Sequence, residues 1–326
     1  EEDEREVEAL AAAIKALATW ENNETLQICR EACGGQGFLS ANLIPALRCD
    51  TDVYATFEGD NTVLLQLVAK RLLADYAKEF RTVNFGVLAR YVVGQATGAA
   101  IHRTGLRGVA QFVADSGSVQ KAALAIKDEA SQRTLLTDRV HTMVAEVATA
   151  LKGANKLPQQ QAAALFNSHQ HELIEAAQAH AELLQWEAFT EALGKVEDPG
   201  TKTVLTWLRD LFGLSLIEKN LSWYLMNGRI SMQRARTVGE YINRLLVKIR
   251  PHALDLVDAF GFGPEHLRAA IATGAERTRQ DEAREFFRQQ RASGDAPVDE
   301  KILLARTAQS GKGKARTAQA GKVKRG

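Results

Sequence analysis

The stretch "FEGDNTVLLQ", residues 57–66, places a carboxylate, a glycine and three small polar side chains directly ahead of a predicted helix. A helix start needs one capping residue such as Asp, Asn, Ser or Thr, and this stretch offers several. Glu58 is therefore more than a cap requires, and a carboxylate is a residue type that can accept protons. The residues alone leave a second interpretation open, in which Glu58 is a surface residue favoured by the helix dipole.

A glycine-rich turn, "ACGGQGF" at residues 32–38, precedes this stretch by about twenty residues. Gly34 and Gly35 cannot continue a helix at low cost, so the preceding helix should stop there. A turn of this composition can bring its backbone close to a ligand, or it can form only a helix C-cap. Both interpretations stay open on the residues alone.

Other residue types with chemical potential do not form a recognisable site. Cys29 and Cys33 are four residues apart, but no nearby pair of His or Cys completes a zinc site, so we expect no bound metal. The seven histidines are scattered over predicted helices, and we interpret them as surface or structural residues. They are His102, His141, His169, His171, His180, His252 and His266.

The chain as a whole is typical of an all-α protein. It contains only six prolines among 326 residues, and the period-2 alternation of strands is nearly absent. We expect an irregular segment at 38–57, which contains Pro45. Helices are predicted at 3–20, from Glu24 to Gly34, and at 62–80, 83–94, 119–152, 159–194, 201–227, 231–250, 252–259, 264–272 and 275–292.

Glycine and serine cluster between Gly94 and Ser118, which predicts a domain junction. We therefore expect one helical domain at 1–115, a second at 116–292 and a disordered basic tail at 293–326. The tail contains the imperfect repeat "ARTAQSGKGK" and "ARTAQAGKVK", which is too poor in apolar residues to form a core. We interpret it as a solubilising tail rather than a nucleic-acid contact, because no aromatic or folded reader accompanies it.

Composition limits the possible classes of protein. Hydrophobic residues make up 45% and charged residues 25% of the chain, and the net charge is +1. No stretch approaches the roughly 18 apolar residues of a membrane span, and the first residues given lack the basic flank and apolar segment of a signal peptide. Three cysteines are too few for a disulfide framework, so we expect a cytoplasmic location. The sequence opens within a predicted helix and without Met, and we expect the chain to be truncated there.

The glycine-rich turn and "EGDNTV", in this order and spacing, resemble the C-terminal helical domain of the acyl-CoA oxidase and acyl-CoA dehydrogenase superfamily. In that family a GGxGF/Y turn precedes an [FY]EG motif. The dehydrogenases usually read EGT, whereas the oxidases read EGE or EGD followed by Asn-Thr-Val. The 268 residues that follow Glu58, including "ALDLVDAFGF" at 253–262, also look like the oxidase branch, and the resemblance extends to about residue 290.

The resemblance implies that Glu58 is the catalytic base, which removes the α-proton of an acyl-CoA while the β-hydrogen leaves as hydride to FAD. It implies that the backbone N–H of Glu58 binds the thioester carbonyl. The glycine-rich turn would approach a FAD held mainly by the partner subunit of a homodimer, and the N–H groups that begin the following helix would suit a phosphate. We interpret Asp60 as a cap. The predicted cofactor-binding residues are Gly34, Gly35, Gln36, Gly37, Gly59, Asn61 and Thr62.

The implied function is that of an FAD-dependent acyl-CoA oxidase of fatty acid β-oxidation, which forms trans-2-enoyl-CoA and reduces O2 to H2O2. One alternative is a dehydrogenase that passes electrons to a flavoprotein. The other is a non-catalytic helical subunit, which the presence of Glu58 argues against. Family members carry a β-barrel-like domain that this chain lacks, so we expect it to be the C-terminal part of a longer enzyme. We expect the isolated chain neither to retain FAD nor to oxidise acyl-CoA.

Overall fold

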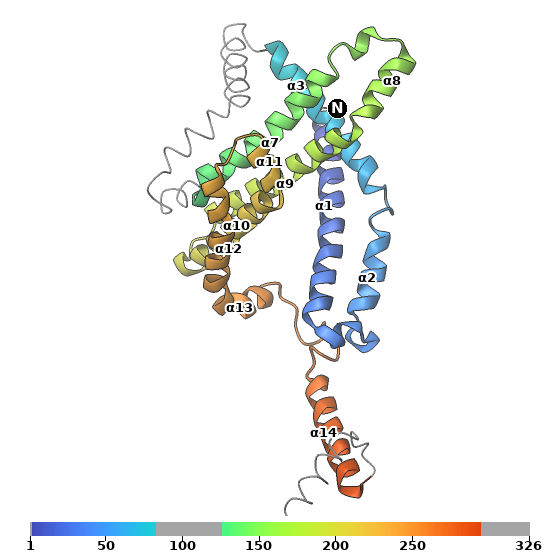
Figure 1. The fold of residues 1–326 in the computed structure, drawn as a ribbon, viewed down its shortest axis with the longest axis vertical. Coiled ribbons are helices and arrows are strands. Elements are labelled where there is room, and N and C mark those ends of the chain that lie inside the picture. Colours follow the sequence, from blue (N-terminus) through green and yellow to red (C-terminus); the bar gives the residue numbers. More distant parts are fainter. Residues whose placement is uncertain (1, 83–125, 295–326) are drawn as a thin grey trace, which may run out of the picture. The chain divides into compact units, whose positions relative to one another are not determined.

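The computed structural model describes residues 2–82 and 126–294, and its regular elements there are all helices (Figure 1). These residues contain no strand, which confirms the all-α prediction. The predicted helix at 83–94, the junction at 94–118 and nearly all of the tail lie outside the described residues. The predicted domain boundaries therefore stay predictions.

The chain divides into two compact units, Glu1–Ser40 with Ile44–Gly261, and Ala41–Leu43 with Phe262–Gly326. The first unit begins with the long helix α1, Glu2–Ala32. We predicted two helices here, and that was wrong. The residues between the two predicted helices, Trp20–Glu24, contain neither Gly nor Pro, so the helix continues through them. Asn22 in this segment contacts α2, because its Nδ2 donates to Thr51 Oγ1 at 3.5 Å.

After α1 the chain forms two short 3-10 turns, η1 at Gly34–Phe38 and η2 at Ser40–Asn42. Helix α2, Ile44–Val53, then runs back alongside α1 (Figure 1). We expected irregular structure here because of Pro45, and that was wrong. Pro45 is the second residue of α2, and a missing N–H costs nothing in the first turn of a helix.

Helix α3, Asn61–Thr82, confirms the prediction at 62–80. It shares a core with α1, α7 (Glu129–Ala150) and α9 (Gln170–Gly194). Three of the four buried side chains that α1 contributes to this core are alanines, which lets the neighbouring helices approach closely. The buried residues are Ala12, Ala13, Ala16, Leu17, Leu65, Val68, Ala69, Val147, Leu173, Ala177 and Ala181.

The remaining helices of the first unit surround a second core that contains Trp186, Leu214 and Tyr224. The helix predicted at 159–194 is divided at His169 into α8 (Gln159–Ser168) and α9, with η3 (Ala154–Lys156) before it. The helix predicted at 201–227 is divided at Asn220. It forms α10 (Pro199–Lys219) and α11 (Leu221–Met226). They are followed by α12 (Met232–Ile249), η4 (Arg250–His252) and α13 (Ala253–Asp258).

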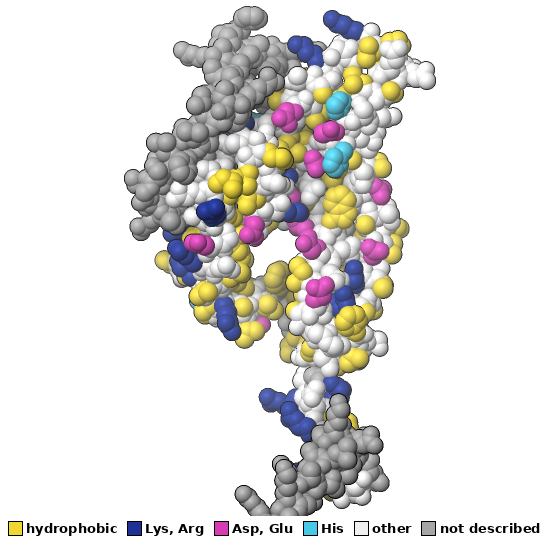
Figure 2. Space-filling model, viewed as in Figure 1, with side chains coloured by type: hydrophobic (Ala, Val, Ile, Leu, Met, Phe, Trp, Pro, Cys, Tyr) yellow, Lys and Arg dark blue, Asp and Glu magenta, His cyan; other side chains and the backbone are white. Residues whose placement is uncertain are grey.

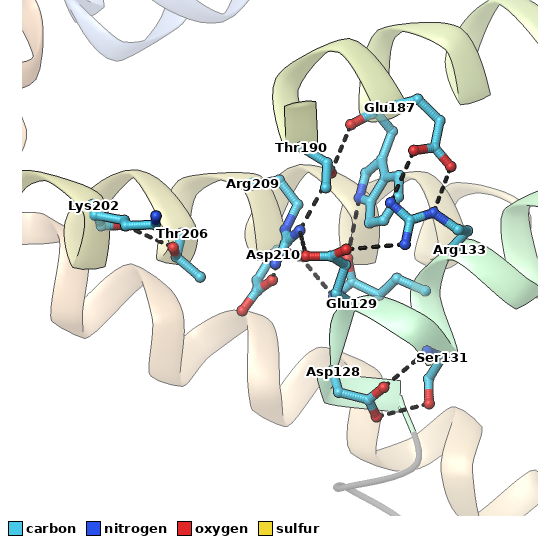
Figure 3. A network of polar contacts seen from close by, with 12 residues as sticks. Asp128, Glu129, Ser131, Arg133, Glu187, Thr190, Lys202, Thr206, Arg209 and Asp210 are labelled. Atoms are coloured by element: carbon cyan, nitrogen blue, oxygen red, sulfur yellow. Dashed lines mark hydrogen bonds and ion pairs between the residues drawn. The ribbon is translucent and has the colours of Figure 1, made fainter. Parts of the chain in front are cut away.

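A network of charged side chains joins the start of α7 to α9 and α10 (Figure 3). Arg209 Nη1 lies 2.9 Å from Glu129 Oε2, and Arg133 Nε lies 2.7 Å from Glu187 Oε1. The hydrogen bond from Arg209 holds the pKa of Glu129 below its usual value. We call this set, Glu129, Arg133, Glu187 and Arg209, the ionic network. Both arginines also lie over the ring of Trp186, with their guanidinium carbons 5.1 and 5.3 Å from its centroid.

The second unit joins two segments that are far apart in sequence. Asn42 is buried, and its Oδ1 accepts a hydrogen bond from Ile271 N at 2.9 Å, while Ala270 N donates to Ala41 O at 3.2 Å. These amides are therefore not paired within a helix, and the helix predicted at 264–272 is absent. Helix α14, Ala275–Ser293, confirms the prediction at 275–292.

Large hydrophobic side chains lie exposed on the first three helices. Figure 2 shows hydrophobic side chains on the visible face over α1 and α2. On α1 and α3, Val7, Ile14 and Val63 are each about 60% exposed. Within the residues described, no helix is long and apolar enough to cross a membrane.

Candidate active site

Glu58 lies in the tight turn that joins α2 to α3. The turn is closed by backbone hydrogen bonds from Phe57 N to Val53 O at 2.8 Å and from Asn61 N to Ala55 O at 3.0 Å. The Glu58 side chain is exposed, and its backbone has a φ of +57°. Gly59 follows with a φ of +104°, so the chain reverses direction over these two residues.

The backbone of Glu58 is strained. A non-glycine residue in the left-handed region costs on the order of 1–3 kcal/mol, and such residues cluster at functional sites. Among the described residues, only Glu58 and Leu43 are non-glycine residues with positive φ, at +57° and +63°. Leu43 directly precedes α2, and Glu58 follows α2 in the turn to α3. Helix α2 is the helix that separates the two sequence motifs. The strain at Glu58 persists only if the surrounding contacts hold it.

Asn61 supplies several of these contacts. Its side chain is 1% exposed, and Nδ2 donates to Thr19 Oγ1 at 2.8 Å and to Ala16 O at 3.3 Å on α1. Its Oδ1 accepts a hydrogen bond from Lys15 Nζ at 2.8 Å. The amide of Asn61 is thus directed into the protein. Its predicted contact with FAD stays a prediction, while its observed role is to join the start of α3 to α1.

Asp60 caps α3, which confirms the role we expected for it. Its Oδ1 accepts hydrogen bonds from Thr62 N at 2.9 Å and Val63 N at 3.3 Å. Leu64 N donates to Asp60 O at 2.9 Å. We expected free N–H groups here for a phosphate, and that was wrong, because Asp60 and Ala55 already pair them. The Thr62 side chain itself is exposed.

The glycine-rich turn η1 has an open side and a packed side. A Cβ built on Gly34 or Gly35 would meet nothing within 4 Å, and Gly34 has a φ of +55°. A Cβ on Gly37 would lie 2.0 Å from Arg30 O, so only glycine lets the turn pack against α1. Gln36 is half-buried. The open backbone of Gly34 and Gly35 fits the close approach of a flat or phosphate-bearing group, as the adenosine-diphosphate half of FAD requires.

The two predicted parts of the site lie at opposite ends of α2 (Figure 1). A helix of ten residues is about 15 Å long, so Glu58 and the glycine-rich turn do not line one small pocket. This separation is compatible with the implication that the two parts contact different FAD molecules of a dimer. It is equally compatible with a single extended ligand.

Lys15 and Thr19 also belong to this site, although we did not predict them from the sequence. They are four residues apart on α1, so they share one face of the helix, and Ala12 and Ala16 are buried close by. A lysine and a threonine beside a stripe of buried alanines is the signal that could have indicated them. Their partner, Asn61, lies more than forty residues away and could not be identified from the pattern.

A cavity of about 480 Å³ lies elsewhere in the first unit, between α1, α3, α7 and α9. Leu10, Val68, Asp75 and His180 are among its lining residues, and burial lowers the pKa of His180. None of the predicted site residues lines this cavity. In the described part of the chain, no group of three or more His, Cys, Asp or Glu side chains could hold a metal ion.

Two family models match the chain. Residues 128–274 match the model described as acyl-CoA oxidase, and residues 1–73 match the acyl-CoA oxidase C-alpha1 domain. The first match contains the ionic network and the second contains both sequence motifs.

Curated proteins similar to this chain carry names of the same kind. An acyl-coenzyme A oxidase-like protein of Mus musculus is 28% identical over 266 residues, which are 81% of this chain and 40% of that protein. The peroxisomal acyl-coenzyme A oxidase 2 of Arabidopsis thaliana is 30% identical over 271 residues, 82% of this chain and 37% of that protein. The chain thus spans about 40% of the length of these relatives.

Solved structures share the fold. Acyl-CoA oxidase 1 of Arabidopsis thaliana aligns with a TM-score of 0.66 at 24% identity, covering 86% of this chain and 40% of that one. Acyl-CoA oxidase-1 of Caenorhabditis elegans, in complex with FAD and ATP, aligns with a TM-score of 0.64 at 19% identity. It covers 94% of this chain and 44% of that one.

Proposed function

This chain belongs to the acyl-CoA oxidase family, and we propose that it is the C-terminal part of an FAD-dependent acyl-CoA oxidase in which Glu58 is the catalytic base. The observation that carries the proposal is the turn at Glu58. A strained carboxylate-bearing residue lies at the position where the family motif places a base, and its neighbours Gly59 and Asn61 are joined to α1 by hydrogen bonds.

In the proposed reaction, the Glu58 carboxylate accepts the proton from the α-carbon of an acyl-CoA. The backbone N–H of Glu58 donates to the thioester carbonyl and stabilises the negative charge that develops there. FAD bound in the complete enzyme would supply the acceptor for the β-hydrogen as hydride and would pass two electrons to O2, and the proton taken by Glu58 would complete H2O2. The products are trans-2-enoyl-CoA and H2O2, so protons and electrons balance.

We propose that the open backbone of Gly34 and Gly35 contacts the adenosine-diphosphate half of FAD, with Gln36 and Thr62 as further polar contacts. Gly37 and Gly59 would contribute through their lack of a side chain. Gly37 lets the turn pack on Arg30 O, and Gly59 adopts a φ of +104°. We also propose a homodimer in which the glycine-rich turn reaches the FAD of the partner subunit. The exposed position of Glu58 in this chain is consistent with a flavin-binding segment that covers it in the complete enzyme.

The compartment of this chain stays a prediction. The cytoplasmic location that we expected rests on the small number of cysteines in the sequence. The Arabidopsis relative described above and a human relative are named peroxisomal. Fluorescence microscopy of the tagged complete enzyme would distinguish the cytoplasm from peroxisomes.

The test is to produce the complete enzyme with Glu58→Gln and to measure H2O2 formation from acyl-CoA and flavin absorbance. We expect turnover to fall roughly 10²-fold or more, because the proton acceptor is lost, while flavin content stays unchanged. Glu197→Gln is the matched control, since Glu197 is exposed and lies outside both motifs. Unchanged turnover in Glu58→Gln would contradict the proposal.

The complete wild-type protein, assayed in the same way, distinguishes an oxidase from a dehydrogenase and from a non-catalytic subunit. Turnover that requires an added electron acceptor and forms no H2O2 would indicate a dehydrogenase. A complete wild-type protein that binds flavin but turns over no acyl-CoA under either condition would indicate a non-catalytic subunit.

A further inference from the structure

Lys15 reaches across from α1 to the turn that carries Glu58. Lys15 is half-buried, and its ammonium donates to Gly59 O at 2.6 Å and to Asn61 Oδ1 at 2.8 Å. The ammonium thus contacts the carbonyl next to Glu58 and the first residue of α3 at once. An ammonium group has three donors, and these two bonds are charge-assisted.

The bond to Gly59 O matters because of the backbone around it. Glu58 and Gly59 both have positive φ values, +57° and +104°, and neither lies within a helix whose hydrogen bonds would fix it. The bond from Asn61 N to Ala55 O closes the turn but does not restrain the peptide group between Gly59 and Asp60. Lys15 holds the oxygen of that peptide group, so it limits the rotation of the backbone that directs the Glu58 side chain.

The acceptor Asn61 is itself fixed from the other side. Its Nδ2 donates to Thr19 Oγ1 at 2.8 Å, and Thr19 Oγ1 donates to Lys15 O at 2.9 Å. Lys15, Thr19 and Asn61 therefore form a closed set of polar contacts between one turn of α1 and the start of α3. A polar set that is satisfied in this way around a buried amide favours one geometry over others.

We propose that Lys15 is a positioning residue for Glu58, which holds the Gly59 carbonyl so that the Glu58 carboxylate lies where it can accept a proton. This inference rests on the proposed function of Glu58. Displacement of a catalytic group by about 1 Å can cost on the order of 10²-fold in rate. Loss of the Lys15 hydrogen bonds should therefore lower kcat strongly and change KM only slightly.

The experiment compares Lys15→Met, Lys15→Arg and Lys202→Met in the complete enzyme. Lys15→Met keeps an unbranched side chain and removes the donors, and we expect kcat to fall by about 10- to 100-fold with KM within about threefold of wild type. Lys15→Arg keeps charge and donors and should recover a large part of kcat. Lys202→Met is the matched control on an exposed lysine of α10, and its kcat should equal that of wild type.

A second measurement does not depend on activity. In the 326-residue chain, hydrogen exchange of the amides at 58–61 should be faster in Lys15→Met than in wild type, with unchanged exchange in α9 as the internal reference. If Lys15→Met does not fold, Thr19→Val is the second variant. It removes the hydroxyl that accepts from Asn61 Nδ2 and donates to Lys15 O, but it keeps both hydrogen bonds of the Lys15 ammonium, and it should produce a smaller loss of kcat of the same kind.

The outcomes separate the two proposals. A Lys15→Met variant with wild-type kcat, or with unchanged amide exchange at 58–61, would overturn the positioning role of Lys15. The proposed function would stay intact in that case, provided that the wild-type enzyme turns over acyl-CoA. A complete wild-type enzyme without turnover, or Glu58→Gln with full turnover, would overturn the proposed function instead. The exchange measurement would then still decide whether Lys15 orders the turn.

Discussion

The turn at Glu58 and the ionic network around Trp186 are both held by polar contacts between helices, but they use different chemistry. At the turn, one ammonium, one amide and one hydroxyl restrain a strained backbone beside an exposed carboxylate. In the ionic network, carboxylates and guanidinium groups pair with each other around a fully buried indole (Figure 3). Among the described residues, Glu58 at the turn has no ion-pair partner, whereas Glu129 and Glu187 of the ionic network are each paired with an arginine.

This difference indicates which carboxylates are available for chemistry. Glu129 and Glu187 each form an ion pair with an arginine, and the hydrogen bond from Arg209 lowers the pKa of Glu129. Glu58 has no ion pair among the described residues. The C-terminal helices thus pair their charges with each other, and the turn beside α3 presents a carboxylate without an ion pair among the described residues, as the proposed role of Glu58 requires. Three substitutions test this division, in order of decreasing effect.

Arg139→Met should cause the largest loss of stability. Arg139 Nη1 lies 2.7 Å from Glu182 Oε2, and their side chains are 8% and 2% exposed. Without Arg139 the buried Glu182 carboxylate retains only Gln178 and Lys219, whose Nζ lies 3.8 Å away. We expect the free energy of unfolding to fall by about 3 kcal/mol, measured by urea denaturation of the 326-residue chain.

The control for Arg139→Met is the double variant with Glu182→Gln, which removes the unpaired charge and should recover part of the loss. A folded complete enzyme with Arg139→Met should retain kcat, because the pair lies among the core helices and not at the turn. A loss of kcat larger than the loss of folded protein would show that the two regions are coupled.

Gly37→Ala should have an intermediate effect. The added Cβ would lie 2.0 Å from Arg30 O, which is backbone and cannot move aside easily, so we expect a loss of about 1–3 kcal/mol. Gly35→Ala is the matched control two residues away, where the Cβ would meet nothing within 4 Å and stability should not change. Thermal unfolding of both variants measures the difference. Equal melting temperatures would mean that η1 does not pack against α1 as described.

Glu129→Gln should have the smallest effect, and the effect should depend on pH. The hydrogen bond from Arg209 lowers the pKa of Glu129 in the folded state, so its ionised form stabilises the fold. This contribution is complete above the unfolded pKa, about 4.3, and is lost as the pH falls through the lower folded value. The stability difference between wild type and Glu129→Gln should therefore shrink between about pH 5 and pH 3. A difference that grows over this range would contradict the assignment.

Local patterns predicted most of the helices, because apolar periodicity and stop signals are properties of neighbouring residues. The error at α2 came from Pro45, whose position within a first turn could not be distinguished from a break. In the site, the cap at Asp60 was predictable from residue types and spacing, whereas the role of Glu58 is implied by the family resemblance and stays a prediction. The inward direction of Asn61 and the reach of Lys15 were not predictable, since both depend on how α1 packs beside α3. Such long-range pairings have no signature in one stretch of sequence.

The hydrogen bond between Asn42 and Ile271 spans 229 residues and has a consequence for synthesis. A ribosome that adds roughly 5–20 residues per second needs about 10–50 s to reach the second partner after making the first. During this interval Asn42 lacks its hydrogen bond from Ile271 N, and the next residue, Leu43, has a left-handed backbone in the folded chain. The connection that leads into α2 is therefore among the last parts of the chain to be locked, and the nascent polypeptide must remain unaggregated until then.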